Sequence, residues 1–230
     1  MQGTKCTAIV LAGGQGKRMG TSVQKQYLEI EGKPILYYTL RAFQDSEIID
    51  EIVLVVGANQ EEYCKQEIVD KYQISKVRHI VAGGAERYHS VWSGLSTVED
   101  GYVFIHDGAR PFVNDAIIRR AYDAVKVHGA CVSAMPGKDT IKIADADEFA
   151  ECTPDRSKVW MVQTPQVFAC DLIKEAYSKL MENEIAGITD DAMVVEKILG
   201  RRVKLVLGAY ENIKITTPED LDIAGVFLRK

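Results

Sequence analysis

The sequence predicts an α/β fold built on a doubly wound, mostly parallel sheet. Three observations support this class. Short runs rich in Val, Ile and Ala alternate along the chain with helical patterns. The runs lack the polar alternation of half-exposed strands, which is typical of parallel strands buried on both faces. Four of the strand-like runs are followed by clusters of glycine or charged residues, at the edge where such a sheet binds ligands.

The elements of the first half follow in order. Strands are predicted at residues 7–11, 52–56, 77–81, 103–106 and 130–134. Helices are predicted between them at residues 34–44, 61–72, 90–98 and 115–128. The last helix is the clearest, because its apolar residues recur at helical spacing, namely Ile117, Ile118, Ala121, Ala124 and Val125.

The pattern changes near Pro136. Residues 138–160 hold two short strand-like pieces, 140–143 and 149–153, with acidic turn residues between them. They predict a projecting β-hairpin. A hairpin with so little apolar surface is expected to cover another surface, such as a second subunit, although a flexible surface ribbon is the alternative.

The remaining elements continue the alternation. An apolar run at residues 160–168 is interrupted by Pro165, and a helix is predicted from about residue 171 to 182. Residues 189–191 predict a helix N-cap with acids in the first turn, and Thr217-Pro218 predicts another helix start. Residues 203–207 predict a strand. Without repeats or linkers, residues 1–230 are expected to form a single domain with an arm at about 138–160.

Composition narrows the class of protein. The 230 residues carry a net charge of −5, with no basic stripe, which argues against nucleic-acid binding. The five cysteines are scattered and odd in number, so reduced thiols are expected. Neither a signal peptide nor an apolar run of membrane-spanning length is evident, so we expect a cytoplasmic protein that does not bind membranes.

The opening stretch AIVLAGGQGKRMGTSVQKQY is the strongest functional signal. A buried strand leads into Gly13, Gly14 and Gly16, and three cations follow at Lys17, Arg18 and Lys25. Glycine lets backbone N–H groups approach a ligand closely, and cations neutralise charge that develops during reaction. The pattern favours a polyphosphate site over the alternative, a strand-to-helix turn with solvated cations. The stretch matches neither the P-loop pattern G-x-x-x-x-G-K-[ST] nor the dinucleotide-binding pattern G-x-G-x-x-G.

Three further clusters follow predicted strands. Residues 83–87, GGAER, precede Ser90, where either a ligand site or a glycine turn with Ser90 as helix cap is possible. HDGARP places Asp107 and Arg110 at a strand end, which suits phosphate and Mg²⁺ together. Lys214 lies in the strand-like run YENIKIT, where a buried lysine needs an anionic partner. Together the clusters predict phosphoryl or nucleotidyl transfer.

The motifs LAGGQGKRMG, KQY, ERYHSV, HDGARP, DTIK, TPQVF, TDDA and NIKITTPEDL occur in this order between Leu11 and Leu221. In them the chain closely resembles the 2-C-methyl-D-erythritol 4-phosphate cytidylyltransferases of the non-mevalonate isoprenoid pathway. The resemblance implies a Rossmann-like nucleotidyltransferase fold. It also implies transfer of a cytidylyl group from CTP to the polyol phosphate, with release of pyrophosphate and with Mg²⁺ as cofactor.

The resemblance also implies roles for individual residues. Catalytic roles fall to Arg18, Lys25, Arg156 and Lys214. Nucleotide binding falls to Leu11, Ala12, Gly13, Gly14, Gly16, Gly84, Ala85, Ser90, Gly108 and Lys214. Substrate binding falls to Asp107, Arg110, Thr140, Arg156, Thr164 and Thr189, with Asp107 also near the metal. Thr140 and Arg156 would come from the hairpin arm of a partner subunit, which makes the active unit a homodimer.

Two departures and two alternatives accompany the resemblance. Gln24 stands where the family usually has proline, and Ala85 stands where an acid is frequent. The alternative within the same chemistry is the sister family of ribitol-5-phosphate cytidylyltransferases. Residues 138–140 and 189–192 favour methylerythritol phosphate over ribitol phosphate as the substrate. The alternative from another class is a non-catalytic nucleotide-binding module, against which the glycine spacing counts.

Overall fold

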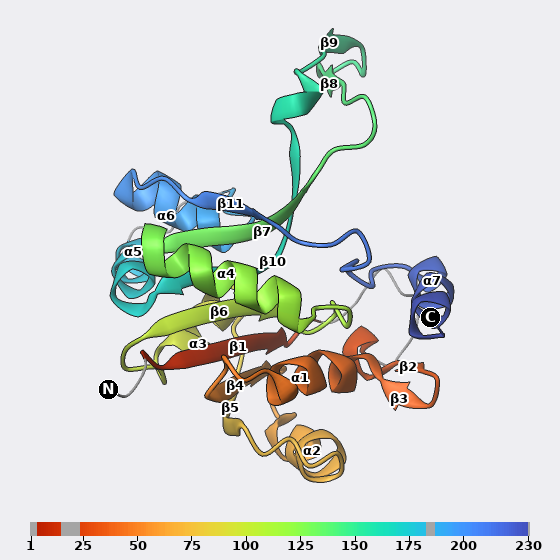
Figure 1. Ribbon diagram of the computed structural model, residues 1–230, viewed down its shortest axis with the longest axis vertical. Coiled ribbons are helices and arrows are strands. Elements are labelled where there is room, and N and C mark those ends of the chain that lie inside the picture. The colour runs from red at the N-terminus through yellow and green to blue at the C-terminus, as the bar shows by residue number, and fades with distance from the viewer. Residues whose placement is uncertain (1–3, 15–23, 183–186, 230) are drawn as a thin grey trace.

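A seven-stranded sheet forms the centre of the computed structural model, which describes residues 4–14, 24–182 and 187–229 (Figure 1). Its order is β11-β7-β10-β6-β1-β4-β5. The strands are β1 (Cys6–Ala12), β4 (Glu51–Val56), β5 (Val77–Ala82), β6 (Tyr102–Asp107), β7 (Ala130–Pro136), β10 (Trp160–Ala169) and β11 (Lys204–Leu207). Only β10 runs antiparallel to its neighbours in this sheet, so the predicted mostly parallel α/β fold is confirmed.

Helices cover both faces of the sheet, as a doubly wound fold requires. One face packs against α1 (Ile35–Asp45), α2 (Glu61–Cys64) and α4 (Asp115–His128). The other packs against α3 (Arg87–Leu95), α5 (Cys170–Glu182) and α6 (Asp191–Leu199). Alternate residues of β1 pack into the two hydrophobic cores on either side of the sheet. Ala8 and Val10 lie in the core of the first face, and Ile9 lies in the core of the second.

A smaller layer closes one end of the molecule. The hairpin of β2 (Glu29–Ile30) and β3 (Lys33–Pro34), which the sequence analysis did not predict, packs beside α7 (Pro218–Leu228). Helix α7 begins as predicted, with Thr217 in a capping box and Pro218 at the first position.

Several predicted elements differ in detail. Strand β5 is an edge strand with half-exposed side chains, so the expectation that residues 77–81 are buried on both faces was wrong. The helix expected at 61–72 is α2 followed by a π-helical segment, Lys65–Asp70. Pro165 does not end the strand at 160–168, because the β10 ladder accommodates it in a register shift between Val162 and Gln166.

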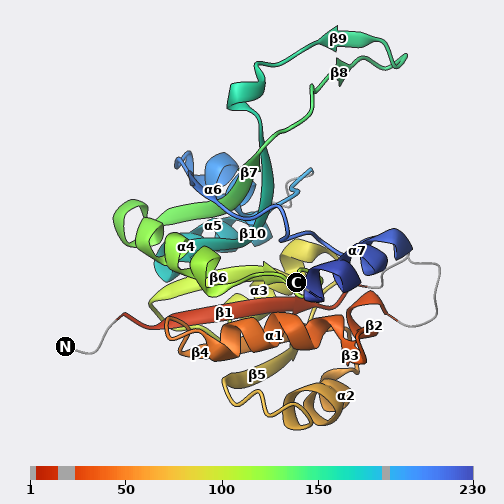
Figure 2. The same cartoon turned by 45° about the vertical axis from the view of Figure 1, so that its right-hand side comes forward.

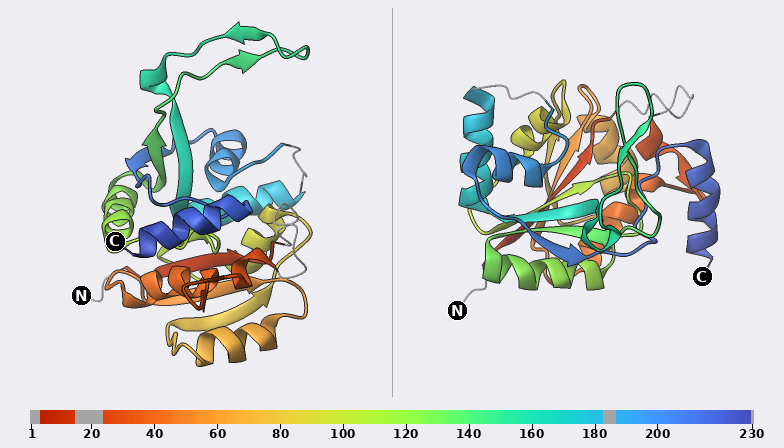
Figure 3. Two further views of the ribbon diagram at one scale, coloured as in Figure 1. Left: turned by 90° about the vertical axis from the view of Figure 1, so that its right-hand side faces the viewer. Right: turned by 90° about the horizontal axis from the view of Figure 1, so that it is seen from above.

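The predicted hairpin is present and stands away from the body of the molecule (Figures 2 and 3). Its strands, β8 (Ile143–Ala144) and β9 (Ala150–Cys152), are shorter than the pieces read from the sequence. A 3₁₀ turn at Arg156–Lys158 leads from the arm into β10. Every residue of β8 and β9 is exposed, so the arm has no core of its own.

The cysteines are all free thiols, and Cys152 on the arm is the exposed one. In the described ranges we find no helix with the length and apolar character needed to cross a membrane.

One glycine limits how β1 and β6 can meet. Gly101 has φ +88°, and a Cβ placed on it would collide with the carbonyl oxygen of Lys5. Gly129, the left-handed C-cap of α4, has a similar φ of +73° but open space around the Cβ position. Comparing the same substitution at both glycines therefore distinguishes the cost of a left-handed backbone from the cost of a steric collision.

We predict that Gly101→Ala destabilises the protein more than Gly129→Ala. Gly129→Ala should cost about 1–2 kcal/mol, the strain of a left-handed residue with a side chain. Gly101→Ala should add a collision cost of about 1–3 kcal/mol. Urea unfolding of both variants measures the difference, and equal losses would contradict the collision argument.

Candidate active site

A cleft of about 840 Å³ opens at the carboxyl ends of β1, β4, β5 and β6. This is the edge at which a doubly wound sheet binds ligands. Its walls come from Leu11, Ala12, Gly13, Gly14, Gln24, Lys25, Gln26, Val56, Gly57, Ala58, Gly83, Gly84, Ala85, Glu86, Arg87, Ser90, Asp107, Ala109 and Lys214. All four clusters singled out in the sequence contribute to this one cleft.

The backbone after β1 is held close to β4. A Cβ on Gly13 would lie 3.2 Å from the carbonyl oxygen of Val56, so a larger residue here would have to push the two chain segments apart by a few tenths of an ångström. The buried Gln26 donates from Nε2 to the Ala12 carbonyl at 2.6 Å, which ties residues 24–27 to the end of β1. Gly16 and Arg18, two of the predicted site residues, lie outside the described residues.

Lys25 reaches the cleft from a short 3₁₀ turn, Lys25–Tyr27. Its Nζ donates to the carbonyl oxygen of Ile215 at 3.2 Å. The opening segment is thereby joined to the segment that carries Lys214, and the two predicted catalytic lysines line the same cleft.

The loop after β5 forms the opposite wall. Glu86, rather than Ser90, caps α3, in a reciprocal arrangement with His89. The Ser90 hydroxyl instead accepts from the Gly84 N–H at 3.2 Å and donates to the Glu86 carbonyl at 3.3 Å. A Cβ on Gly83 would lie 2.6 Å from that hydroxyl, so the glycine allows the loop to fold back on its helix.

Asp107, the last residue of β6, is the electrostatic centre of the cleft. Its carboxylate lies 2.9 Å from Lys214 Nζ and 3.6 Å from the Nε atoms of both Arg87 and Arg110. Burial would raise the pKa of Asp107, but the three cations outweigh it and hold that pKa far below its usual range. The predicted need of Lys214 for an anionic partner is met by Asp107. The segment around Lys214 is irregular rather than a strand.

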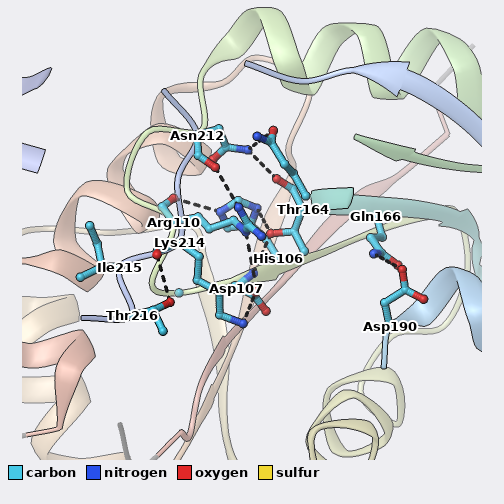
Figure 4. Close-up of polar contacts among 12 residues, drawn as sticks. His106, Asp107, Arg110, Thr164, Gln166, Asp190, Asn212, Lys214, Ile215 and Thr216 are labelled. Carbon is cyan, nitrogen blue, oxygen red and sulfur yellow. Dashed lines mark hydrogen bonds and ion pairs between the residues drawn. The ribbon is translucent and has the colours of Figure 1, made fainter. Parts of the chain in front are cut away.

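Hydrogen bonds behind Asp107 hold it in place (Figure 4). The Thr164 hydroxyl accepts from the Asp107 N–H at 3.1 Å and lies 3.0 Å from His106 Nδ1. His106 Nε2 lies 3.1 Å from the Arg110 carbonyl, an acceptor, so the imidazole carries its proton on Nε2 and accepts from Thr164. Arg110 in turn donates to the Asn212 carbonyl at 2.8 Å.

Arg87 is a site residue that the sequence analysis included in the 83–87 cluster but to which it gave no role. Its guanidinium makes two 2.8 Å bonds to Asp191, which is fully buried and also accepts from the Tyr177 hydroxyl at 2.6 Å. The partners are 104 positions apart, so no local pattern could reveal the pair. The available signal was the presence of arginine and aspartate in two quoted motifs, ERYHSV and TDDA.

Other predicted residues lie outside the cleft walls. Gly108 supports them, because its N–H donates to the Leu11 carbonyl at 2.8 Å. Thr189 is exposed, with its hydroxyl 3.9 Å from the Met193 sulfur, and Asp190 rather than Thr189 caps α6. Thr140 and Arg156 are exposed on the arm, where Arg156 donates to the Lys138 carbonyl at 3.1 Å. Their predicted substrate contacts stay predictions.

The described residues hold no group of three or more His, Cys, Asp or Glu side chains arranged to hold a metal ion. Of the two carboxylates among the described lining residues, Glu86 and Asp107, it is Asp107 that faces three cations. A Mg²⁺ ion fits here only if phosphates supply most of its ligands, with at most one oxygen from Asp107. Asp107 as a metal ligand stays a prediction.

We predict that His106 makes stability depend on pH. Burial lowers the pKa of His106 from 6.5 to about 4, so its full contribution is present above pH 6.5. As the pH falls from 6.5 to 4, the unfolded chain takes up a proton that the folded chain refuses. The free energy of unfolding therefore falls, by an amount that approaches about 3 kcal/mol. His106→Gln, which retains a donor and an acceptor, should flatten this dependence in urea unfolding. Parallel wild-type and variant profiles would contradict the assignment.

Comparisons with known proteins show which family the chain belongs to. The family model of 2-C-methyl-D-erythritol 4-phosphate cytidylyltransferase matches residues 6–230. A protein of that name from Lachnospira eligens is 56% identical over 225 residues, covering 97% of this chain and 99% of the relative. The one from Alkaliphilus metalliredigens is 49% identical over 229 residues, covering 99% of this chain and 94% of the relative.

Solved structures give the same result. The crystal structure of the 4-diphosphocytidyl-2C-methyl-D-erythritol synthase from Anaerococcus prevotii superposes with a TM-score of 0.87 at 34% identity, covering 99% of this chain and 97% of that one. Sequence family and fold therefore agree. The chain belongs to the 2-C-methyl-D-erythritol 4-phosphate cytidylyltransferase family.

Proposed function

We propose that this protein transfers the cytidylyl group of CTP to 2-C-methyl-D-erythritol 4-phosphate, giving 4-diphosphocytidyl-2-C-methyl-D-erythritol and pyrophosphate for isoprenoid biosynthesis. The observation that carries the proposal is the cleft itself. In a chain of this family, it gathers the glycine backbone after β1, Lys25, Asp107 and Lys214 at one edge of the sheet.

In the proposed reaction a phosphate oxygen of the polyol substrate attacks the α-phosphorus of CTP. A new P–O bond forms, and the bond from the α-phosphorus to the oxygen bridging it to the β-phosphorus breaks, so that pyrophosphate leaves with the electron pair. Catalysis of this kind needs positioning and charge stabilisation rather than a protein nucleophile. Lys25 and Lys214 supply cations from opposite ends of the sequence, and the backbone of residues 12–14, which lines the cleft, is assigned to the triphosphate.

Charge accounting supports a requirement for Mg²⁺. The described lining residues include three cations (Lys25, Arg87 and Lys214) and two carboxylates (Glu86 and Asp107), a net charge of +1. A triphosphate and a phosphate monoester, the latter alone about −1.5 to −2, exceed that charge. The substrate phosphates, with at most one oxygen from Asp107, would hold Mg²⁺, whose charge would offset the repulsion between the reactants.

One experiment tests the activity and its alternatives. CTP is offered with methylerythritol phosphate or with ribitol phosphate, with and without excess chelator, and pyrophosphate is measured. Release with methylerythritol phosphate that stops in chelator supports the proposal. Preference for ribitol phosphate would move the protein to the sister activity. Absence of pyrophosphate with either polyol, while CTP still binds, would leave a non-catalytic nucleotide-binding module.

We predict that Lys25→Ala lowers turnover by about 10²–10³-fold while CTP affinity changes little, because the cation faces charge that develops in the transition state. The same is expected of Arg18→Ala. Lys71→Ala is the matched control, since Lys71 pairs with Glu67 on the surface at 3.1 Å. Steady-state kinetics and CTP titration separate the two effects. Near-normal turnover of both site variants would rule out their assigned roles.

We further propose that the arm completes the active site of a second copy of the chain. Large hydrophobic side chains are exposed on the arm and at its base, namely Ile143, Phe149, Met161, Val162, Leu205, Leu207 and Tyr210. Thr140 and Arg156 do not line the cleft of their own chain. A closed two-fold pair would bury this apolar surface and deliver Arg156 to the partner's polyol phosphate.

We predict that two inactive variants restore each other's activity if the arm crosses. Arg156→Ala and Lys25→Ala homodimers should each be nearly inactive. A mixed dimer would hold one site with both defects and one site with neither. Random pairing of equal amounts should therefore recover up to about a quarter of wild-type activity.

The mixing experiment needs evidence of exchange. Tagging the two variants differently and isolating the doubly tagged species shows that subunits have exchanged. If that species forms and remains inactive, Arg156 acts within its own chain or the arm does not cross.

A further inference from the structure

A chain of charged groups links the cleft to α5 and α6, beyond the residues assigned above. Asp191 lies at the first position of α6 with none of its surface exposed, and it receives two bonds from Arg87 and one from Tyr177. Arg87 Nε then faces the Asp107 carboxylate at 3.6 Å, and Asp107 faces Lys214 at 2.9 Å. Four charges of alternating sign thus run from a buried helix end to the cleft.

The start of α6 is held rigidly, so Asp191 is a fixed anchor. Asp190 accepts from the Met193 N–H at 2.9 Å, and Gln166 Oε1 accepts from the Ala192 N–H at 2.8 Å. Gln166 Nε2 also donates to Asp190 at 3.0 Å (Figure 4). Gln166 belongs to β10, which pairs with β6, so its hydrogen bonds fasten the start of α6 to the central sheet.

Arg87 is more than a buried structural ion pair. Its side chain keeps 31% of its surface exposed, and it lines the cleft next to Glu86. The two terminal nitrogens are committed to Asp191, which leaves Nε as the group directed at Asp107. The planar guanidinium fixes the relation between these directions, which an ammonium group could not do.

We propose that Arg87, anchored by Asp191, is a positioning residue that sets the orientation of Asp107 and, through it, of Lys214. This rests on the proposed function, because Lys214 is assigned there to the phosphates. Without Asp191, Arg87 can turn both terminal nitrogens to Asp107 and compete with Lys214 for the same carboxylate. Lys214 then loses the partner that holds it in place.

The proposal predicts a specific kinetic defect. Asp191→Asn, which retains the shape of the side chain, should lower kcat by about tenfold or more. CTP affinity, measured by titration without the polyol, should change less than about threefold, because the glycine loops are untouched. Arg87→Lys should show the same pattern, since a lysine cannot hold both carboxylates in one plane.

Tyr177→Phe is the matched control, because it removes one hydrogen bond from the same buried carboxylate and leaves the Arg87 pair intact. A purely structural role predicts that kcat falls in step with unfolding free energy in all three variants. Positioning predicts that Tyr177→Phe keeps kcat within about twofold of wild type despite its loss of stability.

Coupling to Lys214 decides the matter. In a Lys214→Ala background, Asp191→Asn should lower kcat by less than about twofold, since the group it positions is gone. A full additional loss there, or equal kcat losses in Asp191→Asn and Tyr177→Phe, would overturn the proposal. If Asp191→Asn fails to fold, Arg87→Lys supplies the same comparison. Inactive wild-type protein would instead refute the proposed function.

Discussion

The ion pairs that the Asp107 carboxylate makes are the interactions on which the cleft depends. The carboxylate collects cations from three separate segments: Arg87 at the start of α3, Arg110 after β6 and Lys214 after β11. A buried ionised carboxylate without partners is very costly, and removing one partner of a buried pair typically costs about 3–5 kcal/mol. Since each segment is distant in sequence from the others, this single charge makes the cleft walls mutually dependent.

The doubly wound sheet explains why those segments can converge. Parallel β1, β4, β5 and β6 end at one edge, so the four loops that follow them must meet there. The antiparallel β10 adds a fifth contribution in the opposite direction, since it carries Thr164 up to the end of β6. Asn212 then binds the Thr164 carbonyl at 2.8 Å, which fastens the segment carrying Lys214 to the same edge.

The sequence was sufficient for those parts of the structure that local patterns encode. Apolar runs and helical periodicity located β1, β4, β6 and α4 within a residue or two, and the glycine and charge clusters at strand ends located the cleft. Burial of β5 was overestimated because an apolar run cannot reveal that a strand lies at the edge of its sheet. Thr189 and Asp190 are both acceptable caps, and only the backbone geometry selects Asp190.

Side-chain pairing across the fold was beyond such reasoning. The sequence indicated that Lys214 needed an anion and that Asp107 lay at a strand end, yet the pairing of the two depends on tertiary approach. Arg87 and Asp191 gave no periodic signal at all, because a bidentate pair is defined by geometry rather than spacing. Long-range charge pairs are therefore the part of this site that required a structure.

The same pairs account for how the cleft can be ready for its substrates. A free lysine side chain loses up to about 1.5–2 kcal/mol of rotamer entropy when it is ordered. Asp107 already orders Lys214 at 2.9 Å, so this cost falls on folding rather than on the approach to the transition state. In the proposed function, an incoming phosphate would have to compete with Asp107 for Lys214, which would weaken ground-state binding. The charge that builds up during the proposed reaction would attract the lysine more strongly, so the arrangement would favour the transition state over the bound substrate.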